Sequence, residues 1–167
     1  MVTQSKLKEL FYYRDDGNLV RLVPTGGPCG QIGRAIGSIS NAGRNRMDKK
    51  YLITKINGQH YCVHKLIYMW HHGYMPEQVD HINRVSLDNR IENLREATAC
   101  ENASNRKVFT SNTSSAKGVS WHKFSSKWYV YINVNRKRIN LGYFKDFELA
   151  ELVASEARDK YHGSFAI

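Results

Sequence analysis

The stretch VDHINRVSLDNRIENLREAT, at residues 79–98, says most about the fold and chemistry of this chain. It predicts two short strands around a polar, asparagine-rich loop. Asp80 and His81 are neighbours in the first predicted strand, and neighbours in an extended strand point to opposite faces. One of these two side chains can therefore bind a metal ion while the other faces a substrate.

Two β-hairpins are predicted upstream of this stretch. LFYYRDDGNLVRLV (10–23) has two apolar-aromatic runs around an Asp-Gly turn at 16–17. YLITKINGQHYCV (51–63) turns at Asn-Gly, residues 57–58. Both dipeptides favour the tight turns of hairpins. Between the hairpins, PTGGPCGQIGRAIGSISNAGRNR (24–46) predicts a glycine-rich, basic loop.

A helix is predicted on each side of residues 79–98. Upstream, Val63, Leu66, Ile67 and Trp70 have helical spacing, and Gly73 is expected to end the helix. Downstream, Thr98 and Glu101 have the spacing of a capping box and predict a helix over ACENASNRK, residues 99–107. VFTSNTSSA, residues 108–116, is small and polar and predicts a linker.

The segment after the linker predicts three antiparallel strands packed under one helix. Along SKWYVYINVN (126–135), apolar residues alternate with polar and tyrosine residues, as in a half-exposed strand. NRKR predicts a turn, and INLGYF (139–144) the next strand. Asp146 is expected to cap the helix and Gly163 to end it. One side of this helix carries Leu149, Ala150, Val153, Ala157 and Tyr161.

The charge distribution indicates a nucleic-acid partner. Lysine and arginine total 25 against 15 aspartate and glutamate, for a net charge of +10. The segment between Glu101 and Asp146 has no acidic residue, and the segment from Arg21 to Lys65 is interrupted only by Asp48. Two long stretches without acidic residues favour binding of a polyanion over an evenly solvated surface.

Several classes of protein are excluded by composition. No apolar run approaches the roughly 18 residues that cross a membrane, and residues 1–10 lack the apolar stretch of a signal peptide. We therefore expect a cytoplasmic protein without a membrane partner. Cys29, Cys62 and Cys100 are widely spaced and form no CxxC pair, which predicts reduced thiols instead of a zinc finger or disulfide framework.

The chemistry that residues 79–105 could support is hydrolysis of a phosphodiester bond. This reaction needs a base to activate water and a metal ion to stabilise charge on the leaving oxygen. His81 suits the first task, because the unperturbed pKa of histidine is about 6.5. Asp80 and the side-chain carbonyl of Asn102 supply oxygen ligands, which suit magnesium or manganese.

Three segments resemble the HNH endonuclease family, in the subgroup common among phage and intron-encoded homing endonucleases. They are VHKL at 63–66, VDHINRVSLDNRIENL at 79–94 and ATACENASN at 97–105. The resemblance covers about residues 50–106. It implies the ββα-metal fold, in which a β-hairpin is crossed by a helix around one divalent metal ion, magnesium or manganese.

The resemblance assigns roles to the matching residues. His81 resembles the general base, and Asp80 and Asn102 resemble the metal ligands. Asn93 resembles the middle asparagine, which holds the loop that carries the catalytic histidine. Asn102 stands where other members have histidine, which removes a nitrogen ligand and shifts the preference away from zinc.

Other positions are peripheral to this catalytic set or differ from the family. Asn89 falls on a frequent loop asparagine, and His64 matches a common histidine to which we assign a structural role. Residues 82–84 read Ile-Asn-Arg where the family usually reads IDG. The remaining histidines of the central region match no motif and are expected to lie on the surface or in packing: His60, His71 and His72.

The last fifty residues resemble the plant ethylene-response-factor (APETALA) DNA-binding domain, which also occurs fused to HNH nucleases. The matches are KGV, KW, LGYF, the alanine-bearing helix and HGSFA, over residues 113–167. That family lays its three-stranded sheet in the major groove and packs its helix behind. Carried over by position, the groove-facing residues are Lys117, Ser120, His122, Tyr131, Asn133, Arg138 and Asn140.

Two kinds of DNA contact are expected from this module. Lys123, Lys127, Arg136 and Lys137 are predicted to contact phosphates, which provide affinity. Among the groove-facing residues, Asn133, Arg138 and Asn140 could reach base edges, which provide specificity.

The sequence thus predicts an α+β protein of two modules. Residues 1–107 comprise the N-terminal β-hairpins and the HNH nuclease module, 108–116 the linker, and 117–167 the DNA-binding domain. We expect a monomer that nicks or cleaves double-stranded DNA at specific sites, as a homing endonuclease of a phage or other mobile element. Two alternatives stay open: a non-catalytic DNA-binding regulator built on the HNH scaffold, and a non-specific HNH nuclease.

Overall fold

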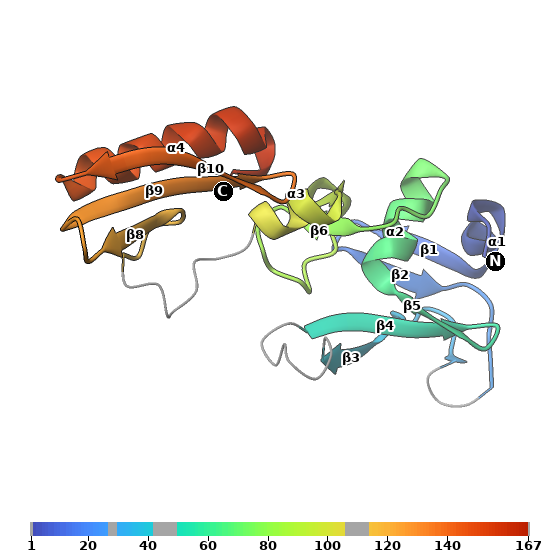
Figure 1. Cartoon of the computed structure of the whole chain (residues 1–167). Helices are drawn as coiled ribbons and strands as arrows, with labels where there is room; N and C mark the ends of the chain where they lie inside the picture. Colours follow the sequence, from blue (N-terminus) through green and yellow to red (C-terminus); the bar gives the residue numbers. More distant parts are fainter. Residues whose placement is uncertain (1, 27–29, 42–49, 106–113, 167) are drawn as a thin grey trace. The chain divides into compact units, whose positions relative to one another are not determined.

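The chain folds into two units, each containing helices and antiparallel sheet (Figure 1). The computed structural model describes residues 2–26, 30–41, 50–105 and 114–166. The first unit spans Met1–Thr98 and the second Ala99–Ile167. The α+β class is therefore confirmed. The division falls before residue 99, whereas the linker was expected at 108–116, of which 108–113 lie outside the described residues.

The first unit opens with a helix that the sequence did not predict. Helix α1 (Gln4–Leu10) is capped by Thr3, whose side chain accepts a hydrogen bond from the Lys6 amide. Leu7 is its buried residue, so the helix lacks the apolar stripe that periodicity detects. It leads into the first predicted hairpin, β1 (Phe11–Arg14) and β2 (Asn18–Arg21), which is confirmed.

A three-stranded sheet follows in the order β3-β4-β5. Strands β4 (Lys50–Ile56) and β5 (Gln59–Cys62) form the second predicted hairpin, with positive φ at both turn residues, 49° and 83°. Strand β3 (Ser38–Asn41) lies where the sequence predicts a loop. It forms by pairing with β4 and leaves Ile39 exposed, so no burial pattern marks it. Residues 27–29 and 42–46 of that predicted loop lie outside the described residues.

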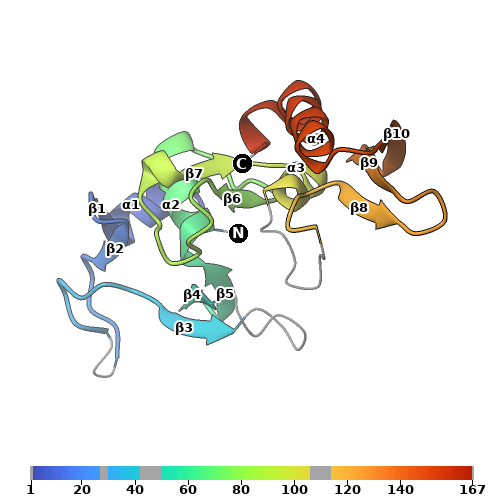
Figure 2. The same ribbon diagram turned by 90° about the vertical axis from the view of Figure 1, so that its left-hand side faces the viewer.

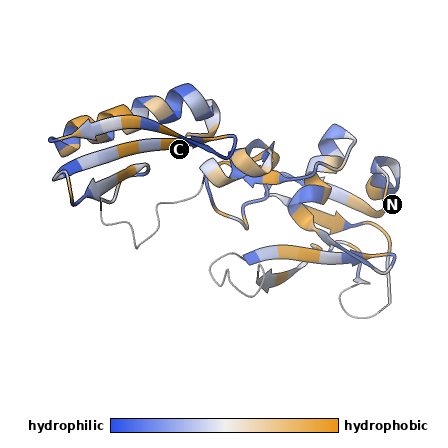
Figure 3. Cartoon of the chain, viewed as in Figure 1, coloured by the Kyte–Doolittle hydropathy of each residue, from blue (hydrophilic) through white to orange (hydrophobic). Residues whose placement is uncertain are grey.

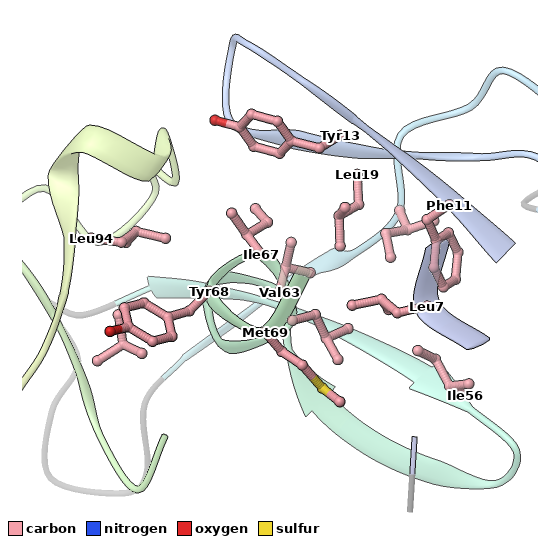
Figure 4. Close-up of a cluster of buried hydrophobic side chains, with 13 residues drawn as sticks. Leu7, Phe11, Tyr13, Leu19, Ile56, Val63, Ile67, Tyr68, Met69 and Leu94 are labelled. Atoms are coloured by element: carbon pink, nitrogen blue, oxygen red, sulfur yellow. The ribbon is translucent and has the colours of Figure 1, made fainter. Parts of the chain in front are cut away.

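Helix α2 (Val63–His72) is the centre of the first hydrophobic core, as Figure 4 shows. Val63, Leu66 and Ile67 are fully buried on the face predicted from their spacing. They pack with residues of α1, the first hairpin and β7, including Leu19 and Leu94. Each such side chain contributes about 1.5–3 kcal/mol through burial. The helix ends at Gly73, with φ of 89°, as predicted.

The stretch 79–98 forms the short hairpin that was expected. Strand β6 (Val79–His81) pairs antiparallel with β7 (Leu94–Glu96), and a 3-10 turn, η2 (Ile91–Asn93), leads into β7. Helix α3 (Ala99–Ser104) comes next, which completes a ββα order along the chain. The helix was predicted to reach residue 107; it ends at Ser104, and residues 106 and 107 lie outside the described part.

The second unit contains a three-stranded antiparallel sheet with one long helix packed on it (Figure 2). The strands are β8 (Val119–His122), β9 (Lys127–Val134) and β10 (Lys137–Phe144), in the order β10-β9-β8. Helix α4 (Phe147–His162) begins after Asp146, whose side chain accepts from the Glu148 amide, and is followed by η3 (Gly163–Phe165). This arrangement confirms the predicted sheet and helix.

The buried face of α4 differs in part from the predicted one. Ala150, Ala154 and Ala157 are buried, whereas Leu149 and Tyr161 are largely exposed. The mixture of hydrophobic and hydrophilic segments along this helix is visible in Figure 3. Small alanines lie on the face toward β9, where Val130 is fully buried. Hydrophobicity alone therefore placed Leu149 on the wrong side.

Two expectations from composition concern cysteines and membranes. Cys62 and Cys100 are free thiols, while Cys29 lies outside the described residues. Within the described ranges, no helix is both long and apolar enough to span a bilayer.

Candidate functional site

The β6–β7 hairpin places Asp80 and His81 side by side in the interior of the first unit. Both side chains are buried, with 5% and 6% of their surface exposed. Asp80 lies opposite Arg95 in the strand register, and His81 lies opposite Leu94. Because directly opposite residues share a face, the carboxylate and the imidazole are on different faces of the hairpin. This is the arrangement that the sequence predicts.

The Asp80 carboxylate is held by a guanidinium group. Arg95 donates from Nε and Nη2 to Oδ2, at 2.9 and 2.7 Å. Both side chains are shielded from solvent, so the pair is a buried salt bridge. Sequence analysis did not identify Arg95. Arg95 could be identified only from its position opposite Asp80 in the strand register. That register depends on the number of residues in the loop between the strands.

The His81 imidazole has a side-chain partner in the loop between the two strands. Its Nε2 lies 3.1 Å from Oδ1 of Asn89, a residue that is 1% exposed. Two further rings come from the β4 strand and from α2. The His64 ring lies 5.1 Å from that of His81, and the Tyr51 ring 5.3 Å from that of His64.

His64 is uncharged in this cluster. Burial, followed by the nearby charge of His81, lowers the pKa of His64 to about 3. Its buried Nδ1 has no hydrogen-bond partner in the described ranges. A neutral ring that packs against Tyr51 and His81 fits the structural role expected for this position.

The loop that connects His81 to β7 is fastened by Asn93. Oδ1 of Asn93 accepts from the Asn83 amide at 2.9 Å, and its Nδ2 donates to the Asp88 carbonyl at 2.7 Å. The Asn83 side chain in turn donates to the Asp88 carboxylate at 2.7 Å. Arg90 also donates to this carboxylate and is the main reason that the pKa of Asp88 lies below its usual range. These bonds give Asn93 the geometry needed to hold the histidine loop.

The N-terminal hairpin supports the same loop from the outside. The Tyr13 hydroxyl accepts a hydrogen bond from the Ile91 amide at 3.0 Å. Gly17, at the hairpin tip, lies so close that a Cβ there would be 2.5 Å from the Arg90 nitrogen and 2.7 Å from the Asn89 carbonyl carbon. The sequence predicted the turn at Gly17 but not the contact of Gly17 or Tyr13 with this loop, because contacts between distant segments follow only from the fold.

Comparison with known proteins agrees with this geometry. Residues 61–104 match the family model described as HNH endonuclease. The chain is also 38% identical over 90 residues to Protein 3.8 of Escherichia phage T7. The matched segment covers 53% of this chain and 72% of the phage protein. The chain belongs to the HNH endonuclease family. It therefore carries a phosphodiester hydrolase domain. No solved structure matches it.

HNH nucleases use a divalent metal ion, and the donor chemistry at Asp80 fits one. Carboxylate oxygens are hard ligands that suit magnesium or manganese. The described residues contain no group of three or more histidine, cysteine, aspartate or glutamate side chains that could hold a metal ion.

Asn102, the other predicted metal ligand, lies on α3 in the second unit and is half-buried. The structure thus brings Asp80, His81, Asn89 and Asn93 together in one hairpin and its loop. The approach of Asn102 to Asp80 stays a prediction.

The open face of the second unit's sheet collects most of the predicted DNA-binding residues. In the register of β8–β10, Asn140 lies opposite Tyr131, Arg138 opposite Asn133 and His122 opposite Lys127. Ser120, opposite Tyr129, belongs to the same face. The other face carries Val130, which packs on α4. The alternation in the sequence therefore correctly separated the two faces of β9.

The remaining predicted DNA-binding residues lie outside this face. Lys123 and Arg136 are in the turns that join the strands. Lys137 lies opposite Val134, on the α4 side of the sheet. Lys117 precedes β8, and its Nζ donates to the Ser104 carbonyl at 3.1 Å. Its own carbonyl accepts from Arg158 at 2.9 Å, so Lys117 connects parts of the second unit.

Two tyrosines on the open face were not identified as DNA-binding from the sequence. Tyr129 stacks on Tyr131 with 5.4 Å between ring centroids, and its ring lies 5.0 Å from that of Tyr143. The Arg138 guanidinium lies 4.2 Å from the centroid of the Tyr131 ring. Tyr143 joins this row because the register shifts between Asn140 and Gly142. Such a β-bulge reverses the in-out pattern of a strand and is hidden from simple alternation.

Proposed function

We propose that this HNH endonuclease nicks or cleaves double-stranded DNA at specific sites. The observation that carries the proposal is the pair Asp80 and His81. These neighbours are buried on opposite faces of one hairpin, and each is held by a partner side chain. A carboxylate that can bind a metal ion beside an imidazole that can accept a proton is what metal-dependent phosphodiester hydrolysis requires.

His81 acts in this proposal as the general base. It takes a proton from a water molecule, whose oxygen forms a bond to phosphorus while the bond from phosphorus to the leaving deoxyribose oxygen breaks. One magnesium or manganese ion, held by Asp80 and Asn102, would stabilise the negative charge on that leaving oxygen. Asn93 keeps the loop after His81 in place through its bonds to Asn83 and Asp88.

The second unit is proposed to dock on the DNA through its open sheet face. The sheet and its turns carry basic residues without an acidic one, whereas α4 carries four carboxylates. The basic residues are Lys123, Lys127, Arg136, Lys137, Arg138 and Lys145, and the acidic residues of α4 are Glu148, Glu151, Glu156 and Asp159. This separation directs a polyanion to the sheet. The resemblance of this segment to ethylene-response-factor domains supports the same face.

The tyrosine row favours duplex DNA over single strands. Tyr129 has Tyr131 and Tyr143 as ring neighbours, and Arg138 covers Tyr131. Rings that cover one another offer their edges and hydroxyl groups to a ligand. Groove readout uses such hydrogen-bonding edges, whereas single-strand binding relies on open ring faces for base stacking.

The first prediction tests the catalytic assignment. His81→Ala should reduce nicking of a supercoiled plasmid by ~10²–10⁴, while gel-shift affinity stays close to that of the wild type, because His81 serves chemistry and not docking. EDTA should stop the wild-type reaction, and magnesium or manganese should restore it. His60→Ala, which changes an exposed histidine outside the site, is the matched control. Wild-type nicking by His81→Ala, or full activity in EDTA, would refute the assignment.

The two alternative functions give different results in the same assay. A non-catalytic regulator binds DNA but leaves the plasmid supercoiled with every metal tested. A non-specific nuclease produces a ladder of fragments instead of discrete products. We further propose that the protein acts as a monomer in the cytoplasm of a phage-infected cell, with a homing role. One HNH site cuts one strand at a time, so nicked circles should precede linear DNA, and sequencing of the cut ends would define the target.

A further inference from the structure

Asn89 is buried at an energetic cost that its other contacts do not offset. The residue is 1% exposed, and its buried Nδ2 donor has no hydrogen-bond partner among the residues that the structure describes. A buried, unsatisfied amide destabilises a fold by about 1–3 kcal/mol. A leucine, which has the same number of side-chain heavy atoms, has no polar group that needs a partner. Stability alone therefore does not explain an asparagine here.

Within the described part of the chain, the Asn89 side chain has one hydrogen bond, and it reaches His81. Oδ1 lies 3.1 Å from Nε2, and a carboxamide oxygen can only accept. Nε2 must then carry the proton. A neutral imidazole has one N–H, so the lone pair that can take a proton from water is on Nδ1.

The backbone around Asn89 is fixed by separate contacts. Gly17 lies against the Asn89–Arg90 peptide, and the Ile91 amide donates to Tyr13. Arg90 forms an ion pair with Asp88 at 2.7 Å. The carboxamide is therefore presented to His81 from a supported loop, which is what a positioning group requires.

We propose that Asn89 is a positioning residue, which holds the His81 ring in one orientation with the proton on Nε2 and the basic lone pair on Nδ1. The inference rests on the proposed role of His81 as the general base. In this proposal, the Asn89 side chain determines which nitrogen of His81 accepts the proton from water.

The experiment compares three full-length variants with the wild type. Asn89→Leu removes the acceptor and keeps the number and branching of the side-chain heavy atoms, and Asn89→Asp keeps an oxygen that accepts from Nε2. Asn83→Ala is the control, because it removes two hydrogen bonds of the same loop without touching His81. Two quantities are measured: the tautomer of His81 by ¹⁵N NMR of the neutral imidazole, and the nicking rate at saturating DNA alongside gel-shift affinity.

The expected results separate positioning from general loop stability. The wild type and Asn89→Asp should show the proton on Nε2, whereas Asn89→Leu should show a mixture of tautomers. Asn89→Leu should lower the nicking rate about tenfold or more at unchanged DNA affinity, less than the ~10²–10⁴ expected for loss of the base itself. Asn89→Asp should nick much faster than Asn89→Leu, and Asn83→Ala should retain the wild-type tautomer.

Other results would overturn the inference. A wild-type His81 protonated on Nδ1, or Asn89→Leu with the wild-type tautomer and rate, would show that Asn89 does not select the nitrogen. An equal loss of nicking rate in Asn89→Asp and Asn89→Leu would also show that Asn89 does not select the nitrogen. If Asn89→Leu misfolds, Asn89→Ala, which also removes the acceptor, takes its place in the comparison with Asn89→Asp. A wild type that never nicks would refute the proposed function, while the NMR result would still test the tautomer.

Discussion

At the scale of single residues, the Asp80–Arg95 pair joins stability to chemistry. Arg95→Met should destabilise the first unit by about 3–5 kcal/mol, because it leaves a buried carboxylate without its cationic partner. Urea unfolding measures this loss.

The double variant Asp80→Asn with Arg95→Met is the control for that experiment. It should recover much of the stability, since the buried charge goes together with its partner. If Arg95→Met alone is as stable as the wild type, the ion pair contributes little to the stability of the first unit.

His64 makes stability depend on pH in a defined window. Its pKa is about 3 in the folded protein and about 6.5 in an unfolded chain, so only the unfolded chain binds a proton at His64 between these values. The free energy of unfolding should therefore fall as pH falls from 6.5 toward 3.

The test compares urea midpoints at neutral and acidic pH in the wild type and in His64→Gln. The variant should lose less stability on acidification, because glutamine does not titrate. His60→Gln, which changes an exposed histidine, should behave as the wild type does. An equal acid loss in His64→Gln and the wild type would contradict the assignment.

At this scale the sequence predicted the proposed catalytic set, which stays a prediction, but not the side chains that contact it. Asp80, His81 and Asn93 follow from local spacing and from the family resemblance. Arg95 and Asn89 contact them only after β6 and β7 pair in register and the loop between them closes. The same holds for Tyr13 and Gly17, which reach the loop from a segment about seventy residues away.

At the scale of elements, Gly118 determines whether β9 can lie against the segment before β8. It has a φ of +75°, and a Cβ there would be 2.4 Å from the Tyr131 carbonyl oxygen. The Tyr131 amide also donates to the Gly118 carbonyl at 2.8 Å. Gly118→Ala should destabilise the second unit by roughly 2–4 kcal/mol through backbone strain and collision, and thermal melting measures this.

Gly163→Ala is the matched control for Gly118→Ala. Gly163 also has a positive φ, +51°, but open space surrounds its Cβ position. Its variant should cost only the strain of a backbone conformation that alanine rarely adopts, φ 51° and ψ −126°, which is about 1–3 kcal/mol, without the collision at Gly118. Equal melting temperatures for the two variants would mean that the contact with β9 is unimportant.

Helices and strands were predicted well where a local residue pattern determines them, and poorly where they form only through pairing with another strand. Both N-terminal hairpins have clear turn dipeptides, and α2 has an unbroken apolar face. Strand β3 has no such pattern and exists through its bonds to β4. On α4, the packing of alanines against β9 set the buried face and left Leu149 exposed.

At the scale of the whole molecule, charge is expected to govern DNA affinity. Lys127→Ala should lower the slope of log affinity against log salt by about one unit, because Lys127 lies on the open sheet face and would release about one counterion on binding a phosphate. Filter binding at several salt concentrations gives the slope.

Lys160→Ala is the control for this experiment, since Lys160 lies on α4 near the end of the helix. It has the same charge but is not on the open face, and its slope should equal that of the wild type. If Lys160→Ala flattens the salt dependence as much as Lys127→Ala does, DNA does not dock on the sheet.

The sequence predicted modules at 1–107 and 117–167 joined by a linker at 108–116, and this division stays a prediction. The excess of basic residues after Glu101 distinguishes the segment that forms the sheet of the second unit. The contacts nevertheless group α3 with that sheet, partly through Lys117 and Ser104. Such side-chain contacts depend on the folded second unit and carry no local signature.

The contact of the N-terminal hairpin with the histidine loop limits how this nuclease can be re-engineered. A designer who grafts residues 61–104 onto another DNA-binding scaffold would leave behind Tyr13 and Gly17. The transplanted loop would then lack its outer support, and α2 would expose the side that Phe11 and Leu19 cover. A transferable cutting module must therefore include the first hairpin, although that hairpin contributes no residue to the proposed chemistry.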